Sequence, residues 1–142
     1  MGLFAKIFKK KYRLTEDELK WNKMWDLWFE GELEQPISSL LTYDSEIQNG
    51  GHLQFFCNLE EDEEIELRDV LKQLKKILPE EFYVNLEKAY TEYKKLNFNP
   101  ETSEEYCEVA VEEPLVAYDN YYDEHEETIQ NIFKEYASKI NL

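Results

Sequence analysis

The sequence has few of the residues that carry out chemistry or cross-link a chain. Its 142 residues include two histidines, two cysteines, four glycines and four prolines. No apolar run approaches the roughly 18 residues that a membrane-spanning helix needs. Basic residues are also scarce, since 16 Lys and Arg stand against 32 Asp and Glu and leave a net charge of −16. Direct binding to nucleic acid is therefore disfavoured, because neutralising phosphates requires a basic surface.

The motifs of catalysis and metal binding are missing as well. His52 and His125 are 73 positions apart, and no nucleophile elbow, phosphate-binding glycine loop or His-Glu-x-x-His pair is present. Asp119 and Asp123 would share a helix face, but their segment lacks the glycine and the spacing of a calcium loop. Pairs of carboxylates arise by chance among so many acids, so a metal-dependent or carboxylate hydrolase is only a third hypothesis. We expect no enzyme, no metal site and no cofactor.

Aromatic and acidic residues are what the sequence has in quantity. Hydrophobic residues make up 42% and aromatic residues 15% of the chain, which is too many for an acidic disordered segment. One folded domain with its own core is expected at this length. Residues 1–13 carry a charge of +5, whereas residues 14–142 carry 32 acids against 11 bases, or −21. We therefore divide the chain into a basic amphipathic extension over 1–13 and an acidic all-helical domain over 14–142.

The two cysteines bear on the cellular compartment. No secretory segment precedes the fold, so Cys57 and Cys107 are expected to be reduced thiols of a cytoplasmic protein. A single long-range disulfide between them is the alternative, because the sequence does not give their separation.

The spacing of apolar residues predicts helices along the whole chain. Thr15 and Glu18 form the capping box that starts a first helix, which continues to about residue 31. A second helix starts at Pro36 and stops at Gly50-Gly51, and a short apolar segment follows. Further helices are predicted over 67–78, over 80–96 and from Asp119, as N-cap, to residue 140; residues 101–117 give no clear pattern. The expected fold class is all-α, a single compact domain of about six helices with a short amphipathic N-terminal extension.

Two segments carry a family resemblance. The first is an acid followed by Asn-Gly-Gly, Gln, an aromatic pair and Asn, in Glu46-Ile47-Gln48-Asn49-Gly50-Gly51-His52-Leu53-Gln54-Phe55-Phe56-Cys57-Asn58. The second is Tyr118-Asp119-Asn120-Tyr121-Tyr122, with Glu135-Tyr136 near the end of the last predicted helix. Together they resemble the signature of a bacterial domain-of-unknown-function family typified by a DNA-mimic protein, over about residues 15–140.

The resemblance implies binding to a transcription regulator in place of DNA. His52 departs from the pattern, which usually has an aromatic residue such as Phe at that position. From the residues themselves, the Asn-Gly-Gly segment is expected to serve the fold, because glycine supplies the positive φ that a helix end needs before a turn. A ligand-binding loop is the alternative. The expected structural motif comprises Asn49, Gly50, Gly51, Gln54, Phe55, Phe56 and Asn58.

The acidic clusters are the candidate partner-binding residues. Carboxylates three or four positions apart on a helix lie roughly 5–6 Å apart at Cβ, so an acidic helical face can fit a basic DNA-binding groove. Residues 101–127, named the acidic segment below, contain 11 acids and no Lys or Arg. The candidates are Glu60, Glu61, Asp62, Glu63, Glu64, Glu66, Glu104, Glu105, Glu108, Glu112, Glu113, Asp123, Glu124, Glu126 and Glu127.

These clusters predict a basic protein as the partner, either a transcription regulator or a nuclease. Against a nuclease toxin the chain would be an immunity or antitoxin-like protein. The alternative is that the acids only keep the protein soluble.

Residues 1–13 form a separate candidate. Apolar residues recur there at helical spacing among Lys6, Lys9, Lys10 and Lys11, which is typical of a basic amphipathic helix on anionic lipid. A peripheral membrane adaptor is therefore the second hypothesis. Packing of the extension on the acidic domain and a frayed terminus are the alternatives.

Overall fold

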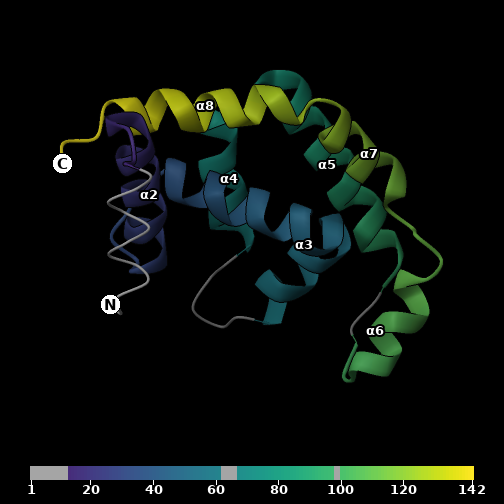
Figure 1. Ribbon diagram of the computed structural model, residues 1–142. Helices are drawn as coiled ribbons and strands as arrows, with labels where there is room; N and C mark the ends of the chain where they lie inside the picture. Colours follow the sequence, from purple (N-terminus) through teal and green to yellow (C-terminus); the bar gives the residue numbers. More distant parts are fainter. Residues whose placement is uncertain (1–12, 62–66, 98–99) are drawn as a thin grey trace. The chain divides into compact units, whose positions relative to one another are not determined.

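The computed structural model is built from helices joined by short connections (Figure 1). It describes residues 13–61, 67–97 and 100–142, without the side chains of Glu60 and Glu61. The described residues form seven helices and no strand, which confirms the all-α prediction. No helix among them is long and apolar enough to cross a membrane. The helices are α2 (Glu16–Phe29), α3 (Ile37–Glu61), α4 (Leu67–Ile77), α5 (Glu80–Lys95), α6 (Ser103–Ala110), α7 (Val116–Glu124) and α8 (Glu126–Ser138).

The described residues pack as two compact units, which are considered separately. Unit 1 comprises residues up to 33 together with residues 127–142, and so contains α2 and nearly all of α8. Unit 2 comprises residues 34–126, with α3 to α7. Of the predicted basic extension only Arg13 is described; its lysines, its helix and its membrane contact lie outside the described residues.

The start of α2 in unit 1 has the predicted capping box. The Thr15 hydroxyl accepts a hydrogen bond from the Glu18 backbone N–H at 3.1 Å, and the Glu18 carboxylate accepts one from the Thr15 backbone N–H at 3.3 Å. N–H groups at a helix start have no partner inside the helix. The predicted helix start is confirmed.

Two lysines of α2 bind the chain at the end of α8. Lys20 Nζ donates to the Ser138 carbonyl at 3.1 Å, and Lys23 Nζ donates to the Asn141 carbonyl at 2.8 Å. Cations are stabilising at such a position because the last carbonyls of a helix lack partners and carry a partial negative charge. These contacts join the two segments of unit 1.

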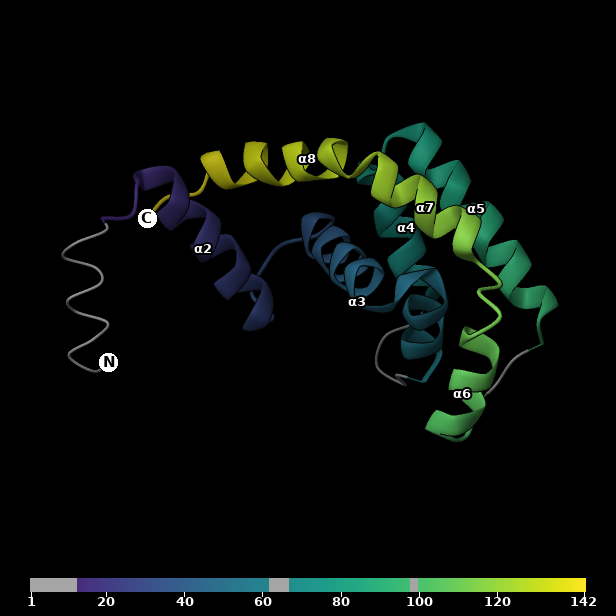
Figure 2. The same ribbon diagram turned by 45° about the vertical axis from the view of Figure 1, so that its right-hand side comes forward.

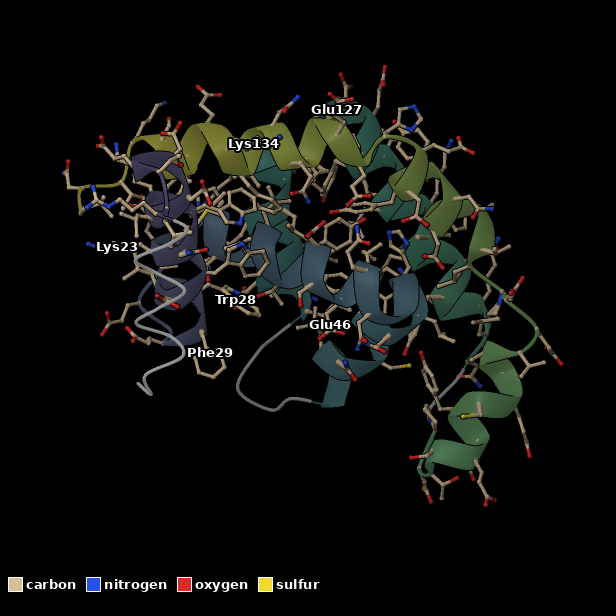
Figure 3. All side chains as sticks on the ribbon, in the orientation of Figure 1. Lys23, Trp28, Phe29, Glu46, Glu127 and Lys134 are labelled. Atoms are coloured by element: carbon tan, nitrogen blue, oxygen red, sulfur yellow. The ribbon has the colours of Figure 1, made fainter. Side chains whose placement is uncertain are left out.

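The aromatic face of α2 is only partly covered. Met24 is its one fully buried residue, and Trp21, Trp25 and Trp28 are half-buried. The rings of Trp25 and Trp28 meet edge to face with centroids 5.5 Å apart. At the end of the helix, the Phe29 side chain is 86% exposed and points away from α2 (Figure 3).

In unit 2, α3 bends at Gly51, where the sequence predicted an end. Gly51 has φ of 76° and ψ of −170°, and the residues after it are helical again to Glu61. This single non-helical residue separates two helical parts, Ile37 to Gly50 and the residues after Gly51, and glycine allows its positive φ at no steric cost. The predicted interruption at Gly50-Gly51 is therefore confirmed, and the apolar segment after it forms the second, helical part of α3. The side chains buried on either side of the bend include Leu40, Leu41, Tyr43, Phe55 and Phe56.

The end of unit 2 differs from the prediction in two ways. Asp119 lies inside α7 and not at an N-cap, because the chain already becomes helical after Leu115. The long last helix is also divided at His125, whose φ of −116° and ψ of 15° separate α7 from α8. Within unit 2, α7 lies beside α5, and α6 stands at the edge of the unit, as both views show (Figure 1, Figure 2).

Candidate functional site

The acids of α6 are presented to solvent by a short, self-capped helix. The Thr102 hydroxyl accepts from the Glu105 backbone N–H at 3.1 Å, and the Glu105 carboxylate accepts from the Glu101 backbone N–H at 2.8 Å. Glu104, Glu105 and Glu108 are exposed, and no side chain of α6 is buried. These bonds are local, so the sequence of this stretch specifies the helix with little help from packing.

The remaining predicted acids of the acidic segment are also accessible. Glu112 and Glu113 are exposed in the connection between α6 and α7, and Asp123 and Glu124 are exposed at the end of α7. Glu126 is half-buried, and Glu127, in unit 1, is exposed. The predicted cluster over residues 60–66 lies outside the side chains that the structure describes, so it stays a prediction.

Basic residues are separated from these acids along unit 2. All seven Lys and Arg of residues 34–126 lie on α4 and α5, between Arg68 and Lys95. In the described part of the chain, no ion pair joins an acid of residues 101–126 to a Lys or Arg, whereas ion pairs elsewhere hold Glu16, Glu92 and Glu135. Among the described residues, the exposed carboxylates of residues 101–126 therefore have no neutralising Lys or Arg.

The two signature segments meet at Gly51 and Asp119. A Cβ built on Gly51 would collide with the carboxylate of Asp119, so this position requires glycine for space as well as for its φ of 76°. The same carboxylate accepts a hydrogen bond from the His52 backbone N–H at 2.8 Å. Asp119 thus supplies a partner to the backbone where α3 bends.

His52 connects that carboxylate to the core of unit 2. Its side chain is fully buried, with Nδ1 2.6 Å from Asp119 Oδ1 and Nε2 2.6 Å from the Tyr43 hydroxyl. A carboxylate can only accept, so Nδ1 carries the proton, and in the neutral ring Nε2 accepts from the Tyr43 hydroxyl. Burial, together with the charges of Asp119 and Asp44, raises the pKa of Tyr43, which keeps this phenol protonated.

A second buried pair lies beside the first. The Tyr122 hydroxyl donates to Asp44 Oδ1 at 2.5 Å, and the rings of Tyr43 and Tyr122 meet edge to face with centroids 5.3 Å apart. Burial first, and then Asp44, raise the pKa of Tyr122. Tyr122 and Asp119, which both belong to the second signature segment, therefore hold α7 against α3.

Glu46 clamps the two parts of α3 together across the bend. Its Oε2 accepts from Gln54 Nε2 and from Asn58 Nδ2, each at 2.8 Å. Figure 3 shows Glu46 on the first part of α3, which places the carboxylate opposite the second. The acid, Gln and Asn of the signature thus act as one hydrogen-bonded group, which is half-buried at Glu46 and Gln54 and exposed at Asn58.

The other members of the expected structural motif are placed in different ways. Phe55 and Phe56 are fully buried, and the Phe56 ring stacks on Tyr93 with centroids 5.0 Å apart. A Cβ at Gly50 would collide with the Gln54 side chain. Asn49 is exposed at a polar pocket that α6 also lines.

The sequence did not reveal the structural roles of Tyr43, Asp44 and His52. A usable signal was present, since polar side chains inside an apolar stretch must find partners when they are buried. What was missing was the partner, because Asp119 and Tyr122 are more than 60 positions further along the chain. No group of three His, Cys, Asp or Glu suited to a metal ion occurs among the residues that the structure describes.

Comparison with known proteins adds one finding. A family model described as DMP19-like protein matches residues 29–139, which is most of the chain and includes both signature segments. No curated protein and no solved structure matches the chain significantly.

Proposed function

Because the chain belongs to the DMP19-like protein family, we propose that it is a non-enzymatic DNA mimic. It binds a basic, DNA-binding protein of the cytoplasm and blocks the nucleic-acid site of that protein. A transcription regulator is the expected partner class. A nuclease toxin would bind through the same electrostatics and is the second partner class. The capture experiment described below distinguishes it from a transcription regulator.

The acidic segment, whose exposed carboxylates pair with no described Lys or Arg, is the observation that carries this proposal. Its carboxylates in α6, in the following connection and at the end of α7 are exposed, and its described residues make no ion pair with Lys or Arg. A surface kept only for solubility would intersperse charges of both signs. An extended stretch of one sign attracts a partner of the opposite sign and raises its association rate.

The spacing of these carboxylates suits a groove built for phosphates. Glu104 and Glu108 are four residues apart on α6, which puts their Cβ atoms roughly 5–6 Å apart on one face. Duplex DNA carries one charge per about 1.7 Å of axis, shared between two strands. A helical row of carboxylates therefore meets the same Lys and Arg side chains that would otherwise bind a phosphate strand.

Capture on the immobilised full chain tests the proposal. Proteins retained from a bacterial lysate at low salt are eluted with a salt gradient or with duplex DNA and identified by mass spectrometry. We expect basic DNA-binding proteins that both eluents release. Retention of neutral proteins that neither eluent releases would contradict the proposal, and recovery of a nuclease would select the immunity role.

A charge-matched pair of variants assigns the binding surface. The triple variant Glu104→Gln, Glu105→Gln, Glu108→Gln should weaken binding of the captured partner about 10-fold, because three exposed carboxylates contribute about 0.5 kcal/mol each. The control is Asp26→Asn, Glu30→Gln, Glu32→Gln, three exposed acids of unit 1 with the same total charge change. Equal losses in both variants would show that net charge alone drives the interaction and would overturn the assignment to α6.

A further inference from the structure

The only two cysteines of the chain line the same pocket of unit 2. This pocket has a volume of about 500 Å³ and lies between the second part of α3 and the segment that contains α6. Cys57 comes from α3 and Cys107 from α6, together with polar residues of both helices. Two thiols that are 50 positions apart in sequence thus line one common space.

Tyr106 adds a phenol to the two thiols of this pocket. Burial raises the pKa of its hydroxyl, and Cys57, Asp119 and Cys107 raise it further through their charges. Tyr106 also lines the pocket, so the phenol and the two thiols surround the same space.

The two thiols differ in access to solvent. Cys107 is exposed, whereas Cys57 is 5% exposed and has its sulfur 3.7 Å from the Tyr93 hydroxyl. An oxidant from solution therefore meets Cys107 first. Cys57 reaches it only across the pocket, which is the arrangement of an accessible thiol beside a second thiol that resolves it.

The helix that carries Cys107 can adjust to a cross-link. A disulfide requires Cα atoms about 4.4–6.8 Å apart, and α6 has no buried side chain that would resist a shift. The α3 side is fixed by contrast, because Phe55 and Phe56 beside Cys57 are fully buried. Any movement needed for bond formation therefore falls on α6.

From this placement we propose that Cys57 and Cys107 are an oxidation-sensitive pair whose disulfide ties α6 to α3. With a peroxide as oxidant, the Cys107 thiolate attacks an oxygen of the O–O bond, which forms a sulfenic acid and releases one water. The Cys57 thiol then attacks the sulfenic sulfur, forms the S–S bond and expels hydroxide, which leaves as a second water with the thiol proton. Two thiols lose two electrons in total, and the peroxide gains them.

This pair would be reduced in the cytoplasm, where glutathione and thioredoxin keep thiols reduced, and would close under oxidative stress. When closed, it fixes the acids of α6 relative to α3. The inference rests on the pocket and the cysteines alone, so it stands or falls independently of the proposed DNA mimicry.

Mass spectrometry of the oxidised full chain tests the pair directly. The reduced protein is treated with a small excess of hydrogen peroxide and digested with trypsin without reductant. We expect the peptides 24–68 and 96–134 to be joined, with a mass lower by two hydrogen atoms than their sum, and to separate with dithiothreitol. A Cys107 oxidised to sulfinic acid beside an intact Cys57 thiol, or a link between two chains, would overturn the proposal.

Protease access gives a readout of the effect on α6. Endoproteinase Glu-C cleaves after glutamate, and Glu104, Glu105 and Glu108 are exposed on this helix. Oxidation should slow cleavage at these residues several-fold, and dithiothreitol should restore it. The variant Cys107→Ser, which changes an exposed side chain and so keeps the fold, should show no slowing. Slowing of equal size in Cys107→Ser would show that the peroxide acts elsewhere.

Discussion

Gly51 is required for two reasons, its positive φ and the lack of space for a side chain, whereas Gly31 is required only for its positive φ. Both have a positive φ, 76° and 73°, but a Cβ at Gly31 would have no atom within 4 Å, whereas one at Gly51 would collide with Asp119. Gly31→Ala should therefore cost about 1 kcal/mol of unfolding free energy. Gly51→Ala should cost about 2–5 kcal/mol, because the clash adds to the backbone strain.

Urea denaturation of the two variants measures this difference. Both positions have a positive φ, so the excess cost at Gly51 reports the contact with Asp119 together with the strain of its ψ of −170°. Equal costs at both positions would show that the carboxylate moves aside freely.

Asp119 is expected to contribute strongly to stability. Asp119→Ala removes the acceptor of both the His52 backbone N–H and the His52 ring and should cost about 2–3 kcal/mol, because buried donors lose their partner. Asp123→Ala, on the same helix but exposed, should change stability by less than about 0.5 kcal/mol. Thermal unfolding followed by circular dichroism compares the two, and a larger loss at Asp123 would contradict the role given to Asp119.

At the scale of single residues, the sequence indicated which residues matter for the fold better than it indicated the contacts that each of them makes. The glycines and the aromatic pair were expected to serve the fold, and the geometry of Gly51, Phe55 and Phe56 agrees with that. The acids were treated as one class, because a sequence gives the charge of a carboxylate but not its partners. Whether Glu46 faces solvent or two amide groups depends on the bend in α3.

Among the helices, α6 is the element that depends least on its surroundings. Glu108→Pro breaks its backbone hydrogen bonding but removes no buried side chain, so the unfolding free energy should fall by only about 1 kcal/mol or less. Glu87→Pro in the middle of α5, which buries Phe82, Leu86, Ala89 and Tyr93, should cost about 3 kcal/mol or more.

Hydrogen exchange of the backbone amides checks this contrast. In Glu108→Pro, loss of protection should be confined to α6, and in Glu87→Pro it should spread through unit 2. A global loss of protection in Glu108→Pro would show that α6 packs more firmly than its exposed side chains indicate.

Helices were easier to predict than their ends. Apolar periodicity specifies α2, α4 and α5 because each buries one face, and the Thr15 box is a local signal. The glycine pair is likewise a local signal for the interruption at Gly51, whereas the break at His125 depends on tertiary contacts. Asp119 resembles an N-cap in sequence, but its carboxylate is committed to His52, so the chain begins α7 earlier without it.

For the molecule as a whole, buried tyrosines predict loss of stability in alkali. Burial raises the pKa values of Tyr43 and Tyr122 in the folded state, so both keep their protons there after the unfolded chain begins to lose them near pH 10. The stabilisation is fully present below that pH. Above it, the unfolding free energy should fall by up to about 1.4 kcal/mol per pH unit for each tyrosine.

Denaturant titrations between pH 9 and pH 11 test this slope. Tyr43→Phe removes one of the two groups and should reduce the slope, whereas Tyr118→Phe serves as a half-buried control. An unchanged slope in Tyr43→Phe would show that other groups cause the alkaline loss.

The net charge of −16 was the most visible feature of the sequence, yet it combines acids with different tasks. Asp44 binds Tyr122, Glu46 binds the side-chain amides of Gln54 and Asn58, and Asp119 binds His52. Glu104 and Glu108, by contrast, face solvent. A mutational scan in cells would separate these groups. Substitutions at the first three should lower the amount of protein, and substitutions at the last two should leave the amount unchanged and affect only what the protein captures. Relatives could therefore exchange their solvent-facing acids freely and acquire new partners, while Asp119 stays in place to hold the bend of α3.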